Sequence, residues 1–182
     1  MMMARSLSVL AALALSATAQ GFELTSQDIQ AGKMMPMAQE YMGFGCEGGN
    51  LSPQLAWREA PPGTRSFAVT VYDPDAPTGS GWWHWLAYDI PADARELARN
   101  AGDTDTDIAP AGMLQHRNDY GATGFGGACP PVGDKAHRYQ FKVYALDVES
   151  LEVDPQSSAA LVGYMIHAHQ IGVAVLEALY KR

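Results

Sequence analysis

The sequence is short of cysteine, of basic residues and of long apolar runs, and each shortage narrows what the protein can be. Only two cysteines occur among 182 residues, so at most one disulfide can form within the chain. Asp and Glu number 20 against 12 Lys and Arg, which argues against nucleic acid or an anionic membrane surface as a general partner. A local anion pocket remains compatible with this balance. The chain also has no G-x-S-x-G motif, the turn that carries the nucleophile of many hydrolases.

The start of the chain has the pattern of a secretory signal peptide. A single cation, Arg5, precedes an apolar run over residues 7–15, and three small residues follow at 17–19. The run is too short to span a bilayer in the usual way, although a membrane anchor is the alternative. We therefore expect residues 1–19 to be removed on export to the periplasm or the medium. The mature chain, residues 20–182, is then a single domain with no transmembrane segment, and loss of Arg5 takes its formal charge from −8 to −9.

Cys46 and Cys129 would meet an oxidising compartment in an exported protein, and two thiols can pair there. Pairing requires their Cα atoms to come within bonding range, which the sequence does not establish. A disulfide between Cys46 and Cys129 is therefore left open at this point.

Strand-like runs separated by Gly, Pro and Asp predict an antiparallel β protein. Residues 66–72 alternate between two faces, and the run ends directly at an Asp-Pro-Asp-Ala-Pro sequence. Residues 82–90 are mostly apolar on both faces, with His84 among the even-numbered residues of one face, which indicates a strand inside a sandwich. Residues 137–145 place His137 on the inward face, near the beginning of a further strand.

The other long segments are a loop-rich stretch and a C-terminal helix. Residues 98–136 form a connection longer than most in a compact domain, and such stretches are typically functional or disordered. Residues 157–180 lack proline and are rich in Ala and Leu. We expect them to form a helix capped by Ser157 or Ser158.

Residues 72–77, Tyr-Asp-Pro-Asp-Ala-Pro, combine two carboxylates with two prolines. Each proline fixes its own φ and pushes the preceding residue toward an extended conformation, so Asp73 and Ala76 are held in a stiff loop. In an extended backbone Asp73 and Asp75 are two residues apart and point to the same side. A turn whose aspartates cap backbone N–H groups is one interpretation, and a functional site is the other.

Metal and nucleophile interpretations have less support. A calcium site needs about six to eight oxygen ligands, whereas glycine, serine and tryptophan follow the aspartates. Zinc could take His84, His137 and Asp75, but none of the short spacings typical of zinc sites is present. Cys129 with His137 is the one attractive pair of nucleophile and base, yet Cys-Pro-Pro is a rigid loop and not a helix N-terminus that would lower a thiol pKa. We predict no metal and no cofactor.

A ligand pocket suits these residues better. Histidines can donate hydrogen bonds to an anion, tryptophans supply an aromatic wall, and a carboxylate beside a histidine favours its charged form. The same carboxylates would repel a bare phosphate. A zwitterion therefore suits the set, with Asp75 facing its cation and Trp82 offering a cation–π surface.

Four motifs cover most of the chain after the leader. They are GGNLSPQLAW at 48–57, YDPDAPTGSGWWHWLAYDIP at 72–91, QHRNDYGATGFGGACPPVGDKAHRYQFKVYAL at 115–146 and LVGYMIHAHQIGVAVLEALY at 161–180. Together they resemble the phosphatidylethanolamine-binding protein family, also called the Raf kinase inhibitor protein family, and specifically its bacterial branch. The resemblance covers nearly the whole mature chain, from about Phe22 onward.

The resemblance implies a mainly β fold, an antiparallel Greek-key β-sandwich with a few peripheral helices, one of them C-terminal. It also implies a small surface cavity for phosphate-like anions and the phosphoethanolamine head group. The residues carried over to that cavity are Asp73, Asp75, Ala76, Trp82, His84, Cys129, Pro131, His137 and Tyr139. Cys129 stands where the better-studied eukaryotic members carry glycine. The C-terminal tyrosine that lines their pocket is not carried over onto Tyr180, because the local match is weak.

Three functions follow as hypotheses from this resemblance and from the site residues. The first is a non-enzymatic binding protein for a small phosphorylated or phospholipid head-group ligand. The second is an interaction protein that inhibits a protease or signals to another cell. The third is a hydrolase that uses Asp75, His84 and His137 as acid–base groups. Bacterial relatives are often homodimers, and a surface aromatic such as Tyr144 would suit a dimer contact.

Overall fold

Strands predominate in residues 21–182, which are the residues that the computed structural model describes. In chain order the elements are β1 (Glu23–Thr25), the 3-10 helix η1 (Met37–Gln39), β2 (Met42–Gly43), β3 (Cys46–Glu47), β4 (Leu55–Arg58), β5 (Ser66–Asp73), β6 (Trp82–Pro91), β7 (Glu96–Leu97), β8 (Leu114–Gln115), β9 (His137–Leu146), α1 (Ala159–His169) and β10 (Gln170–Tyr180). The predicted signal peptide, residues 1–19, lies outside the described residues.

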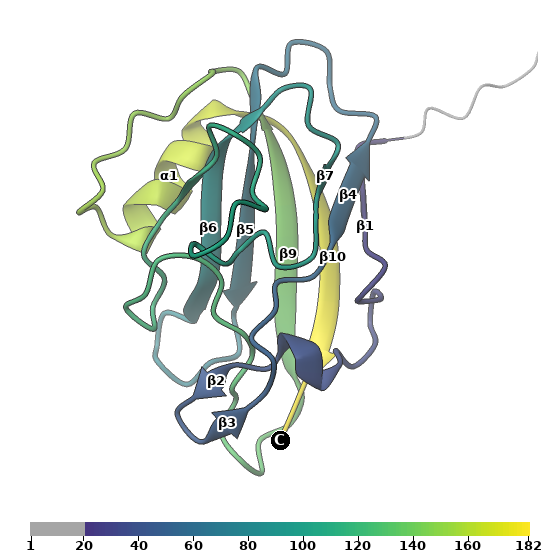
Figure 1. Ribbon diagram of the computed structural model, residues 1–182, viewed down its shortest axis with the longest axis vertical. Helices are drawn as coiled ribbons and strands as arrows, with labels where there is room; N and C mark the ends of the chain where they lie inside the picture. The colour runs from purple at the N-terminus through teal and green to yellow at the C-terminus, as the bar shows by residue number, and fades with distance from the viewer. Residues whose placement is uncertain (1–20) are drawn as a thin grey trace, which may run out of the picture.

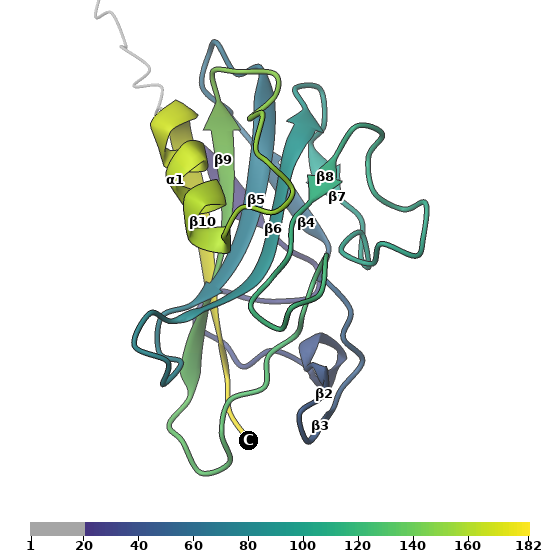
Figure 2. The same ribbon diagram turned by 90° about the vertical axis from the view of Figure 1, so that its left-hand side faces the viewer.

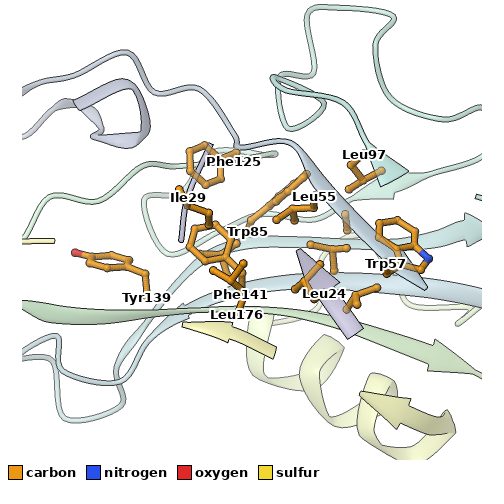
Figure 3. Close-up of a cluster of buried hydrophobic side chains, with 14 of the residues drawn as sticks. Leu24, Ile29, Leu55, Trp57, Trp85, Leu97, Phe125, Tyr139, Phe141 and Leu176 are labelled. Carbon is orange, nitrogen blue, oxygen red and sulfur yellow. The ribbon is translucent and has the colours of Figure 1, made fainter. Parts of the chain in front are cut away.

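Two antiparallel sheets face each other, and α1 covers the outer side of the larger one (Figures 1 and 2). The larger sheet has the strand order β10-β9-β5-β6-β8 and the smaller sheet β1-β4-β7. Side chains of both sheets form the main core (Figure 3), which includes Leu55, Trp57, Trp85, Leu97 and Phe141. A second cluster, with Leu86, Val162 and Ile166, fills the space beneath α1. The predicted mainly β, antiparallel sandwich is therefore confirmed.

The predicted alternation holds in β5 but misplaces one residue of β9. Phe67, Val69 and Val71 of β5 face the main core, as expected. Tyr144 of β9 was predicted on the outer surface, yet it is only 3% exposed, because α1 covers that face of the sheet. Its ring meets that of His167 in α1 edge-on at 5.6 Å. The prediction of Tyr144 as a surface contact for a dimer is therefore wrong.

Irregular pairing between β5 and β6 breaks the alternation predicted for residues 82–90. The register of the two strands shifts at two points. As a result His84 and the next residue, Trp85, both lie on the main-core side, where the His84 ring meets Tyr139 at 5.1 Å. Leu86 belongs instead to the cluster beneath α1. The prediction that His84 and Leu86 share a face is wrong, because an extra residue at a bulge reverses the alternation that follows.

The C-terminal segment is helical only in its first half. Ser158 caps α1 as predicted, and its side-chain oxygen accepts a hydrogen bond from the N–H of Leu161 at 3.2 Å. Residues 170–180 form β10, which pairs antiparallel with β9. The predicted helix is wrong there because burial overrides composition: every second side chain from Ala174 to Tyr180 completes the main core. No helix of residues 21–182 has both the length and the apolar character needed to cross a membrane.

Truncation of a main-core side chain should destabilise the fold strongly. Phe141 in β9 is 0% exposed, so we expect Phe141→Ala to lower the free energy of unfolding by about 3–5 kcal/mol. Val175→Ala, on the exposed side of β10, should change it by less than about 0.5 kcal/mol. Urea titration followed by tryptophan fluorescence measures both values. Equal effects of the two substitutions would contradict the described core.

Candidate functional site

A cavity of about 270 Å³ opens where β5 ends and where β6 and β9 begin. Antiparallel pairing places the last residue of β5, Asp73, opposite the first residue of β6, Trp82. The cavity is lined by Phe44, Asp73, Ala76, Pro77, Thr78, Trp82, His84, Tyr120, Cys129, Pro130, Pro131, His137, Tyr139 and Arg182. All the residues carried over by resemblance are in this lining except Asp75.

A buried carboxylate–imidazole pair forms one side of the cavity. Nδ1 of His137 lies 2.8 Å from Oδ2 of Asp73, and each side chain is 3% exposed. The other oxygen, Oδ1, accepts a hydrogen bond from the backbone N–H of Asp75 at 2.8 Å. Nε2 of His137 faces Oδ2 of Asp134 at the longer distance of 3.4 Å. Both oxygens of Asp73 are thus already engaged, and this carboxylate fixes the orientation of His137.

His84 is buried near the beginning of β6, on the inner side of the cavity. Its Nδ1 lies 2.7 Å from the carbonyl oxygen of Gly126, and because a carbonyl only accepts, Nδ1 carries a proton. Burial lowers the pKa of His84, against the opposing effects of the Gly126 carbonyl and the charge of Asp73. The neutral ring therefore presents the lone pair of Nε2 to a ligand.

A stack of two tyrosines makes the aromatic wall. Tyr120 lies on Tyr41 with the ring centroids 3.9 Å apart, and it meets the ring of Trp82 edge-on at 5.2 Å. Its hydroxyl donates to the carbonyl of Gly127 at 3.0 Å. Tyr120 is not among the site residues expected from the sequence, although it lies within the matched motif at 115–146. No catalytic or metal-binding motif marks Tyr120, because its role in the aromatic wall comes from packing.

Two buried polar groups of the lining lack partners. Within residues 21–182, neither Nε1 of Trp82 nor the hydroxyl of Tyr139 has a hydrogen-bond partner. The Tyr139 hydroxyl points away from the main core (Figure 3). Burial, and then the charge of Asp73, raises the pKa of Tyr139, so the hydroxyl keeps its proton. Both groups can therefore act as donors.

A disulfide holds together two loops at the mouth of the cavity. Cys46 of β3 and Cys129 are joined, with their Cα atoms 6.0 Å apart and a sequence separation of 83. The bond holds the β2–β3 hairpin, which carries Phe44, against the Cys-Pro-Pro loop. The disulfide between Cys46 and Cys129, which the sequence leaves open, is therefore present. Cys129 has no free thiol, so it cannot serve as the nucleophile beside His137.

Arg182 brings a positive charge to the mouth. Its Nε donates to the carbonyl of Pro130 at 2.8 Å and its Nη1 to the carbonyl of Gly45 at 2.6 Å. Its Nη2 makes no hydrogen bond to any residue of 21–182. Arg182 is not among the site residues expected from the sequence, because it follows β10, a segment whose composition predicts a helix.

Asp75 lies outside the cavity lining, which corrects the prediction for this residue. Its carboxylate pairs with the guanidinium of Arg138, with two N–O distances of 2.9 Å. Since His137 and Arg138 are consecutive in β9, they point to opposite faces of the sheet, and so do the aspartates that they bind. Asp73 and Asp75 were expected to point to the same side, and this prediction is wrong because the strand ends at Asp73.

No group of three or more His, Cys, Asp or Glu side chains in residues 21–182 is placed to hold a metal ion. The zinc set considered from the sequence is not assembled, because Asp75 is turned toward Arg138. The acid–base set of Asp75, His84 and His137 is not assembled for the same reason.

Comparison with known proteins shows which family shares these features. Residues 25–181 match the family model for phosphatidylethanolamine-binding protein. UPF0098 protein YbcL of Escherichia coli (strain K12) is 54% identical over 173 residues, which are 95% of this chain and 94% of that protein. The chain belongs to the phosphatidylethanolamine-binding protein family. UPF0098 protein YbhB of the same strain is 47% identical over 159 residues, covering 87% of this chain and 99% of YbhB.

Solved structures agree with this membership. The crystal structure of E. coli YbcL, a member of the same family, superposes with a TM-score of 0.87 at 54% identity, covering 90% of this chain and 99% of that one. A carboxypeptidase Y inhibitor in complex with its cognate proteinase has a TM-score of 0.51 at 18% identity, covering 88% of this chain and 82% of that one. The inhibitor therefore shares the fold alone.

The ion pair of Asp75 predicts a pH dependence of stability. The hydrogen bond from Arg138 is the main cause that lowers the pKa of Asp75 from 3.8 to about 2. Because the folded-state pKa lies below the unfolded value, the pair stabilises the fold above about pH 4, and this contribution is lost as the pH falls toward 2. We expect Asp75→Asn to lower the free energy of unfolding by about 1 kcal/mol at pH 7 and by a clearly smaller amount at pH 2, where the carboxyl is partly protonated in the folded state.

The matched control is Asp93→Asn, which changes an exposed aspartate of the β6–β7 connection. This control should leave stability unchanged at both values of pH. Urea titrations at pH 7 and pH 2 make the comparison, and an equal loss for Asp75→Asn at the two values would contradict the ion pair.

Proposed function

We propose that this chain is an exported binding protein, not an enzyme, whose cavity takes a small phosphate-type anion or the phosphoethanolamine head group of a phospholipid. The observation that supports this most directly is a set of donors without partners at one cavity: Nη2 of Arg182, the hydroxyl of Tyr139 and Nε1 of Trp82. A buried donor left unpaired is costly, so a ligand rich in acceptors stabilises it. A phosphate group offers several acceptor oxygens around one centre.

The charges of the site are compatible with an anion. The carboxylate of Asp73 already accepts two hydrogen bonds, and the carboxylate of Asp75 faces away and is neutralised by Arg138. Arg182 is then the charged lining residue without a counter-ion among residues 21–182. An ammonium group on the same ligand would find the exposed carboxylate of Asp134 and the ring of Trp82 at the rim.

Catalysis by these residues has less support. The hydrolase hypothesis needs Asp75 beside His84 and His137, but that carboxylate is held on the other face of the sheet. The one candidate nucleophile, Cys129, is bonded to Cys46. Binding without turnover is therefore the function that the residues of the cavity support best.

Export is supported by the disulfide as well as by the sequence of the leader. Bonds of this kind persist in oxidising compartments and are rare in the cytosol of mesophiles. Mass spectrometry of the protein recovered from the periplasm or the medium would test the cleavage site. A mature chain beginning at Gln20 is expected, and an intact leader on the recovered protein would contradict export with cleavage.

Inhibition of a protease is a second candidate, supported by the fold that this chain shares with the carboxypeptidase Y inhibitor. Unlike head-group binding, inhibition of a protease does not require a charged group to be bound at Arg182. Purified protein that slows a protease equally well with and without an intact Arg182 would favour inhibition over head-group binding.

Calorimetric titration with phosphoethanolamine tests the cavity. We expect the purified protein to bind this ligand and Arg182→Gln to weaken binding about ten- to a hundredfold, because a hydrogen bond to a charged group contributes about 1.5–3 kcal/mol. Arg65→Gln is the matched control, since Arg65 pairs with Glu149 next to the opposite end of β5. The proposal would be contradicted if Arg182→Gln and Arg65→Gln both bound phosphoethanolamine with the wild-type affinity.

Binding should also take up a proton at His84. In the free protein the lowered pKa leaves His84 neutral, with only the lone pair of Nε2 available, whereas a phosphate dianion requires a donor there. Affinity should therefore fall as the pH rises above about 6.5, by up to about tenfold per unit while the ring keeps its proton in the complex. Calorimetric titrations in two buffers with different ionisation enthalpies give the number of protons taken up on binding. The proton uptake should be lost in His84→Gln and retained in His169→Gln, which changes a half-buried histidine of α1 that pairs with Asp147 and does not line the cavity.

A further inference from the structure

The mouth of the cavity exposes two large apolar side chains on two loops. Phe44, in the β2–β3 hairpin, is 75% exposed, and Val132, directly after the Cys-Pro-Pro loop, is 78% exposed. The disulfide between Cys46 and Cys129 ties these loops together, so both side chains belong to one cross-linked tip. The hairpin, the loop and the end of β10 lie at the same end of the molecule (Figure 1). Apolar side chains presented in this way commonly mark a site of contact.

Positive charge gathers around this tip, although the chain as a whole is acidic. Lys135 follows Val132 in the same loop, and Lys181 precedes Arg182 at the end of β10. Lys33 lies beside that end, where its carbonyl accepts a hydrogen bond from the N–H of Leu179 at 2.8 Å. All three lysines are exposed.

The balance of charge differs elsewhere on the molecule. None of the three lysines at the tip forms an ion pair with a residue of 21–182, whereas several exposed arginines away from it are neutralised by carboxylates: Arg58, Arg65 and Arg99. Asp134 and Glu47 are the exposed carboxylates of the tip. The tip therefore carries more positive than negative charge within an acidic protein.

We infer that this tip, made of Phe44, Val132, Lys33, Lys135 and Lys181, is a docking surface for an anionic phospholipid bilayer. The inference rests on the proposed function and names the source of the ligand, a head group taken directly from a membrane. When a phospholipid head group fills the cavity, its acyl chains leave through the mouth. Phe44 lines the cavity and Val132 follows the lining residue Pro131, so both lie where those chains emerge.

A bilayer matches both properties of the tip. Its acyl boundary accepts Phe44 and Val132, and its anionic surface attracts the three lysines. A stable protein interface requires about 800 Å² from each partner, with a broad apolar centre. Two side chains projecting from narrow loops do not provide such a face. The disulfide also reduces the conformational freedom that the two loops lose on contact.

Sedimentation with vesicles of phosphatidylethanolamine and phosphatidylglycerol tests the surface. We expect Val132→Asp to weaken vesicle binding at least about tenfold, because it places a charge at the acyl boundary. Val175→Asp is the matched control, since Val175 is a 52% exposed valine in the middle of β10. The Val175→Asp variant should bind vesicles with the same affinity as the wild type.

The lysines provide an independent second measurement. Lys135→Gln with Lys181→Gln should weaken vesicle binding about tenfold or more at 0.1 M salt and by a smaller factor at higher salt. Lys142→Gln, in the middle of β9, is its control. Phosphoethanolamine in solution should bind the Val132 and lysine variants within about twofold of wild type, because none of these residues lines the cavity.

The outcomes separate this inference from the proposed function. If the wild type binds phosphoethanolamine in solution but not vesicles, the docking surface is overturned and the proposed function stands. A protein partner on this face with no vesicle binding overturns it equally, as does equal vesicle binding by Val132→Asp and Val175→Asp. Vesicle binding that depends on Val132, without any binding of soluble phosphoethanolamine, supports the surface and contradicts the proposed ligand.

Discussion

β5 pairs with β6 on one side and with β9 on the other, and the candidate site depends on this pairing. The carboxylate of Asp73, at the end of β5, binds His137 at the beginning of β9, 64 positions further along the chain. The opposite neighbour of Asp73 in β6 is Trp82, two residues before His84. One strand end therefore fixes the distance between the two histidines. Since Asp73, His84 and His137 are themselves buried, their side chains have little freedom to rearrange.

The inner and outer parts of the cavity are held by different forces. Strand pairing and aromatic packing hold the inner part, where Tyr120 and Tyr139 enclose His84. The outer part consists of loops, which strand pairing does not restrain. There the disulfide and the two hydrogen bonds from Arg182 to backbone carbonyls hold the loops in place. Recognition of a small charged group and contact with a larger surface can thus be served by separate parts of one end of the molecule.

Much of the fold and of the inner site could be predicted from sequence, because strict alternation marks β5 and β9 and because the motifs place Asp73, His84 and His137. Three of the errors have physical causes that alternation and composition do not reveal. Bulges in β6 separate residues that a regular strand would keep on one face. Pairing with β9 makes a strand of residues 170–180, whose composition favours a helix. The turn after Asp73 sends Asp75 to Arg138 on the other side of the sheet. The role of Arg182 depends on contacts with two distant loops, and no local pattern encodes such contacts.

The order of the elements along the chain has a consequence for synthesis of the protein. β5 and β6 are synthesised before β9, β10 and Arg182. A nascent chain that still lacks these last strands has neither the partner of Asp73 nor the guanidinium at the mouth. Formation of the cavity must therefore wait until β9, β10 and Arg182 have been synthesised, and a chain that stops before them cannot retain a ligand there.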